Sequence, residues 1–84
     1  MEWAWVGEVV HFFDRISVAV IRLDEDLHVG DWIGFVHNGE LLFEQEVTSM
    51  QINREDIASA AAGEDVGLKA DQVVKPGVEV YKTV

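Results

Sequence analysis

The 84-residue chain contains no cysteine, a single proline and only six basic residues. Without cysteine it can form neither a disulfide framework nor a thiolate metal site, and this suits a reducing compartment. No apolar run approaches the roughly 20 residues that a membrane helix needs. No basic segment followed by an apolar one marks a secretory leader. These absences predict a cytoplasmic protein with no membrane partner.

Basic side chains are scarce relative to acidic ones. Lysine and arginine total 6 and aspartate and glutamate total 16, so the formal net charge is −10. Nucleic-acid binding gains free energy from basic contacts to phosphates, and the charge of this chain therefore disfavours RNA as a partner. An acidic surface keeps a protein soluble or faces a basic protein partner.

Motifs of catalysis are also missing. No G-x-x-x-x-G-K-[ST] phosphate loop occurs, so we expect neither GTP binding nor GTP hydrolysis. Ser17, Ser49 and Ser59 all lie outside a G-x-S-x-G elbow. Glu44 and Glu46 share one strand face, which the alternation of an exposed strand explains. We therefore expect a protein that is not an enzyme and needs no cofactor.

The three histidines do not form a metal-binding pattern. His11, His28 and His37 are far apart and have no close histidine or carboxylate partner at a ligand spacing. The acidic stretch 24–26 lacks the glycine and the distal glutamate of a calcium loop. No metal site is predicted.

What the sequence does contain is β-strand pattern. Residues 4–13 alternate, but one face carries Glu8 and the other His11, so periodicity leaves the core face open. Residues 16–23 are almost continuously apolar and β-branched, which predicts a strand covered on both faces. Residues 32–37 form a further strand, and the following Asn-Gly pair is the strongest hairpin signal in the chain.

The second half continues in short segments. The return strand, residues 41–52, changes its apolar phase near Thr48, which predicts a bulge or a sharp bend. Residues 53–62 allow at most one helical turn, capped by Asn53. Strands follow at 65–70, where Gly67 marks a bend or a close approach, and at 78–84. Six short strands separated by turn signals predict an all-β barrel or sandwich.

The tryptophans divide into two groups. Trp5 and Trp32 are expected in or near the core. Trp3 precedes the barrel and is a candidate interface anchor, because an exposed indole rimmed by charge is typical of binding hot spots.

The order of several segments is that of a known family. They are residues 7–10 (GEVV), 27–33 (LHVGDWI), 47–52 (VTSMQI) with Arg54, 60–68 (AAAGEDVGL) and 75–80 (KPGVEV). This series resembles the second domain of elongation factor Tu and related translational GTPases over roughly residues 6 to 82. The resemblance implies a small six-stranded antiparallel β-barrel of the reductase, isomerase and elongation factor common-domain type, formed by residues 1–84 as one domain.

Two narrower groups also share this pattern. One is the small stand-alone translation elongation factor-like proteins, and the other is the C-terminal barrel of collagenase-like peptidases. The length of the chain and its own Met1 favour the stand-alone group.

The resemblance also implies binding residues. In the family this domain holds the aminoacyl end of tRNA, and the corresponding positions here are Gln51, Arg54 and Asp65. Arg54 matches the family. Gln51 is neutral where the family has a carboxylate, and Asp65 is acidic where the family has a neutral donor.

The main reading is a non-enzymatic β-barrel module that docks on a protein partner, which the resemblance connects with translation or tRNA modification. One alternative is a domain that binds an RNA end through Gln51, Arg54 and Asp65. Another is an accessory subunit of a collagenase-like peptidase. In a domain of this size, the free energy gained by burying apolar surface exceeds the entropic cost of ordering the chain by only a little. A homodimer is therefore also an alternative.

Overall fold

The computed structural model describes residues 2–84, and in this part of the chain the regular secondary structure consists of strands. No helix there is long and apolar enough to cross a membrane. The strands are β1 Trp3–Phe13, β2 Val18–Leu23, β3 Leu27–His28, β4 Trp32–His37, β5 Glu40–Glu46, β6 Met50–Ile52, β7 Glu55–Ile57, β8 Ser59–Ala60, β9 Asp65–Lys69 and β10 Glu79–Thr83. The all-β prediction is confirmed, with shorter and more numerous strands than expected.

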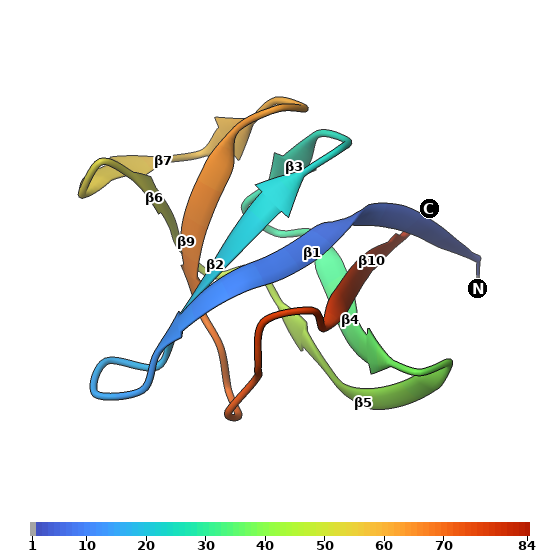
Figure 1. The fold of residues 1–84 in the computed structure, drawn as a ribbon. Helices are drawn as coiled ribbons and strands as arrows, with labels where there is room; N and C mark the ends of the chain where they lie inside the picture. The colour runs from blue at the N-terminus through green and yellow to red at the C-terminus, as the bar shows by residue number, and fades with distance from the viewer. Residues whose placement is uncertain (1) are drawn as a thin grey trace.

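Eight of these strands form one antiparallel sheet that coils around a single core (Figure 1). Its order is β5-β4-β10-β1-β2-β9-β6-β7, and β3 pairs separately with β8. The sheet keeps two edges, β5 and β7, so the backbone ladder does not close into the six-stranded barrel expected from the sequence. The return strand expected at 41–52 ends at Glu46 and resumes at Met50, and this break separates the two edges.

Two bulges in β1 explain why the alternation of residues 4–13 does not indicate which face of the strand packs in the core. The register of β1 shifts between Trp5 and Gly7 against β10, and between Val9 and His11 against β2. Each shift moves the inward position by one residue, so Val6 and Val9 are both fully buried although they differ in parity. A strict two-residue period therefore cannot describe this strand.

Two hairpins turn through the type I′ geometry, in which both central residues have positive φ. Asn38 and Gly39 have φ of 51° and 77°, which confirms the predicted hairpin. Asn53 and Arg54 have φ of 52° and 66° and join β6 to β7. The helical turn expected at 53–62 is therefore wrong, because cross-strand pairing of β7 and β8 satisfies the backbone there.

The core is aliphatic, with one large aromatic ring buried at its centre. Phe35 is fully buried and stacks on Phe43 at a centroid distance of 4.6 Å. Trp32 is 41% exposed, so the expectation that it packs in or near the core is wrong, whereas Trp5 is partly buried. Both indoles lie on the outer side of the sheet.

Gln45 links edge strand β5 to the segment after β9. Among residues 2–84 it is the one polar side chain that is buried, with 4% of its surface exposed. Its Nε2 donates to the Lys69 carbonyl at 2.6 Å, and its Oε1 accepts from the Asp71 amide at 2.7 Å. A side chain therefore makes two hydrogen bonds between segments that the backbone ladder leaves unpaired.

Candidate binding surfaces

The three residues carried over from the family resemblance converge on one groove. The groove, of about 570 Å³, lies on the outer side of β2, β9 and β6. Gln51, Arg54 and Asp65 all line it, and its apolar wall comes from Phe13, Ile16, Val18 and Val20. Gly67 gives room in the floor, because a Cβ there would lie 3.2 Å from Val18 Cγ1.

Two of these three side chains already have partners. Gln51 Nε2 donates to Asp56 Oδ1 at 2.9 Å across the β6–β7 hairpin. Asp65 Oδ1 accepts from Arg22 Nε at 3.3 Å, in an exposed ion pair. Arg54 makes no ion pair within residues 2–84 and its guanidinium remains available to a ligand. The groove therefore offers one cation beside one carboxylate, a weak arrangement for a polyphosphate.

Arg54 stands in a left-handed conformation that non-glycine residues adopt at a cost of roughly 1 kcal/mol or more. In a type I′ turn the second position favours glycine. Substitution Arg54→Gly removes the guanidinium together with the strain. We expect the free energy of unfolding to stay equal or to rise by up to about 1 kcal/mol, measured by urea denaturation.

The matched variant is Arg54→Ala, which removes the guanidinium and keeps the strain. It should be less stable than Arg54→Gly. A loss of more than about 1 kcal/mol in Arg54→Gly would instead mean that the guanidinium itself supports the hairpin.

A second surface collects the large aromatic side chains. Val80 is fully buried, so its neighbour Tyr81 points to the outer side of β10. Trp5 lies opposite Tyr81 across the β1–β10 ladder, and Trp3 is two residues before it on β1. Gly34 lies opposite Tyr81 on β4, two residues after Trp32. All three tryptophans and the single tyrosine of the chain therefore share one outer face, called the aromatic face below.

Gly34 leaves room for the Trp3 indole on this face. A Cβ at Gly34 would stand 3.0 Å from both Trp3 Cη2 and Leu41 Cδ1, so the indole occupies the space that a side chain would need. Next to it is a shallow hollow of about 320 Å³, lined by Trp3, Val36, Gly39, Leu41, Glu79 and Tyr81. The sequence prediction that Trp3 is exposed agrees with its 39% exposure, and its role as an anchor stays a prediction.

Hydrogen bonds fix the polar atoms of the aromatic face. Trp32 Nε1 donates to Glu44 Oε1 at 2.6 Å, and Trp5 Nε1 donates to Asp24 Oδ2 at 2.8 Å. The Tyr81 hydroxyl donates to Glu79 Oε1 at 3.2 Å. Burial and the neighbouring Glu79 carboxylate raise the pKa of the Tyr81 phenol above its ordinary value. The phenol therefore stays neutral at physiological pH.

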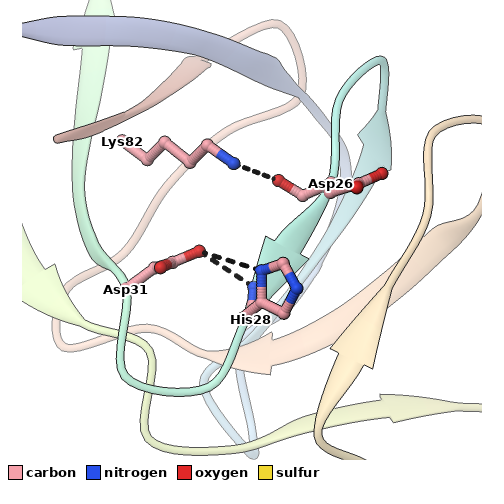
Figure 2. A network of polar contacts seen from close by, with 4 residues as sticks. All are labelled: Asp26, His28, Asp31 and Lys82. Atoms are coloured by element: carbon pink, nitrogen blue, oxygen red, sulfur yellow. Dashed lines mark hydrogen bonds and ion pairs between the residues drawn. The ribbon is translucent and has the colours of Figure 1, made fainter. Parts of the chain in front are cut away.

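Polar contacts hold the end of the acidic bend and the turn between β3 and β4 (Figure 2). Lys82 Nζ donates to the Asp26 carbonyl at 2.6 Å, and Asp31 Oδ2 accepts from the His28 amide at 2.9 Å. The His28 ring Nδ1 lies 3.8 Å from the same carboxylate oxygen. Together with the bond from Trp5 to Asp24, these contacts order the loop that follows β2.

Neither surface carries a catalytic arrangement within residues 2–84. The groove and the hollow are lined by no serine, and no three histidine or acidic side chains gather to hold a metal in this part of the chain. The described surfaces offer contacts for binding.

The chain is similar to a protease in sequence and to solved peptidase domains in structure. No family model matches the chain. An uncharacterised protease of Methanocaldococcus jannaschii is 42% identical over 76 residues, which are 90% of this chain and 19% of that protein. This chain therefore spans about a fifth of the length of that relative.

Solved structures show the same fold. The C-terminal domain of a putative U32 peptidase from Geobacillus thermoleovorans matches with a TM-score of 0.86 at 17% identity, over 95% of this chain and 92% of that one. The selenomethionine variant of that domain matches with a TM-score of 0.83 at 16% identity, over 92% and 96% of the two chains. These matches agree with the resemblance to collagenase-like peptidases and lend no support to the one with elongation factor Tu.

Proposed function

We propose that this chain is a non-catalytic domain that serves a U32-type peptidase as an accessory binding module. One observation carries the proposal: 42% identity over 90% of this chain to a segment of a protease about five times as long. About four fifths of the protease lies outside the matched segment and is available to form the catalytic part of that protein. The segment shared with this chain supplies something other than the whole activity.

The surfaces of the chain support a role in binding. The core is filled by apolar side chains, and the hollows found on it are shallow and open on the outside of the sheet. A net charge of −10 and the absence of cysteine favour a cytoplasmic protein with a basic protein partner. In this reading the partner is the catalytic portion of the peptidase or the substrate that it acts on.

A second candidate function rests on the groove. Gln51, Arg54 and Asp65, the positions implied by the resemblance to elongation factor Tu, line the same hollow, the first two from the β6–β7 hairpin and Asp65 from β9. This convergence favours a site for the end of an RNA strand. The single unpaired cation and the Asp65 carboxylate oppose phosphate, so it ranks second.

The test is affinity purification of the tagged full chain from cells of its own source, with and without nuclease, followed by mass spectrometry. We expect a U32-type peptidase to co-purify in near-equal molar amount, unaffected by nuclease. Recovery of tRNA or translation proteins that disappear with nuclease would favour the RNA-end function. Recovery of neither class would contradict both.

A further inference from the structure

The aromatic face differs from the rest of the surface in both composition and charge. Trp3 and Trp32 are 39% and 41% exposed, and Leu41 beside them is 45% exposed. Tryptophan and tyrosine dominate the energetics of protein interfaces because they bury large areas at low entropic cost. On a chain with three tryptophans and one tyrosine, their collection on a single side of the sheet marks that side as a docking surface.

The charge of this face is one-sided. Its outward strand positions carry Glu79 on β10 and Glu44 and Glu46 on β5, opposite Gly34 and Trp32. Lys82, the nearest basic side chain on β10, alternates to the other side, where it is opposite Ile33 and bonds to the Asp26 carbonyl. Among residues 2–84 the outward positions of β1, β10, β4 and β5 in this patch hold no lysine or arginine.

An indole face next to carboxylates is a site for a planar cation. The six-membered ring of Trp3 is close to Gly34, and Trp3 lines the hollow together with Glu79 and Tyr81. Glu79 is held by the Tyr81 hydroxyl, so its carboxylate is already positioned at the edge of the hollow. A guanidinium stacks on indoles and pairs with carboxylates at the same time, which an ammonium does less well.

We propose that the aromatic face binds an arginine-bearing segment of a protein partner, with the guanidinium in the hollow between Trp3 and Glu79. The identification of that partner as the peptidase rests on the proposed function. The preference for arginine rests only on the residues of the aromatic face. A second copy of the chain fits poorly, because it would bring two bodies of net charge −10 together. RNA would stack on the indoles but place its phosphates against glutamates.

The test is a titration of the full chain with acetyl-Leu-Arg-Leu-Arg-amide, followed by intrinsic tryptophan fluorescence. The matched peptide carries citrulline, which has the shape of arginine and no charge. We expect saturable binding of the arginine peptide, at least about tenfold weaker binding of the citrulline peptide, and weakening by salt. Trp3→Ala and Glu79→Gln should each weaken binding by about fivefold or more.

The control variant is Glu55→Gln, which makes the same charge change on β7, away from the aromatic face, and should leave binding unchanged. Folding of each variant is checked by its urea transition, and Glu79→Gln keeps a group that can accept from Tyr81. Equal binding of both peptides, no saturable response, or no effect of either variant would overturn the inference. So would concentration-dependent dimerisation that Trp3→Ala abolishes.

The outcome of this titration is independent of the purification experiment. Peptide binding without capture of a peptidase would refute the proposed function and leave the arginine site standing. Capture of a peptidase by a chain that does not bind the arginine peptide selectively would do the reverse.

Discussion

Substitution Gly7→Ala is expected to abolish cooperative folding. A Cβ at this position would lie 2.0 Å from the Arg22 carbonyl oxygen and 3.2 Å from Leu23 Cα. Both are backbone atoms of β2, paired with β1 at the centre of the sheet, so neither can move without breaking the ladder. A cost above about 4 kcal/mol is expected, which is most of the stability of a domain of this size.

The matched control is Gly67→Ala on β9. A Cβ there would lie 3.2 Å from Val18 Cγ1, on a side chain that can shift, and 3.9 Å from the Gln51 carbonyl oxygen, which is an ordinary contact distance. We expect a loss of no more than about 2 kcal/mol and a native spectrum. Circular dichroism and urea denaturation of both variants decide the point. Equal stability of the two variants would contradict the close approach of β1 to β2 at Gly7.

Substitution Gln45→Glu is expected to produce the second large loss, of about 3 kcal/mol or more at neutral pH. The side chain is 4% exposed, and its amide both donates to Lys69 and accepts at Asp71. An ionised carboxylate has the same shape but only accepts, so it would face the Lys69 carbonyl without a proton between them. It would also carry its charge into a largely buried position.

The pH dependence separates this explanation from a packing defect. Burial raises the pKa of the introduced carboxyl in the folded state, so the folded protein binds its proton more tightly than the unfolded chain does. The deficit relative to wild type should therefore shrink as the pH falls below that pKa, where the acid can again donate. Glu46→Gln, an exposed change on the same strand, should alter stability by less than about 0.5 kcal/mol. A pH-independent deficit in Gln45→Glu would contradict the hydrogen-bonding role.

Elements whose conformation depends on residues close together in the chain could be predicted from the sequence. The strand at 32–37 has the observed bounds of β4, and the Asn38-Gly39 turn has the predicted geometry. The turn at 53–54 could not be predicted in the same way, because Arg54 adopts a conformation that its residue type disfavours. Pairing of β6 with β7 imposes that conformation.

Long-range features were harder to predict. The bulges of β1 are shifts of its register against β10 and β2, which are separate strands, so periodicity within β1 could not reveal them. The sheet has open edges at β5 and β7, and the break after Glu46 was indicated by the sequence only as a phase slip. The two hydrogen bonds that Gln45 makes to Lys69 and Asp71 have no local signal in the sequence, because a glutamine on an alternating strand is ordinarily predicted to be exposed.

The candidate surfaces were predictable in part. The groove residues Gln51, Arg54 and Asp65 were named through family resemblance, and the fold brings them together. Trp3 was named from its position ahead of the predicted barrel. Tyr81 and Glu79 were missed, although their alternation with Val78 and Val80 was a usable signal for an outward face. Trp32 was expected in or near the core, and its place on the outer face follows only from the pairing of Trp32 with Glu46 on β5 and of Gly34 with Tyr81 on β10.

Binding through the aromatic face is tested most directly by nuclear magnetic resonance of the ¹⁵N-labelled chain mixed with the unlabelled U32-type peptidase that the proposed function expects to co-purify. The indole Nε1–H signals of Trp3 and Trp32 report on this face, and the Arg54 Nε–H signal reports on the groove. Selective shift or broadening of the indole signals, with Arg54 unperturbed, is the predicted result. Perturbation of Arg54 with unchanged indoles would place the interface on the groove and contradict docking through the aromatic face.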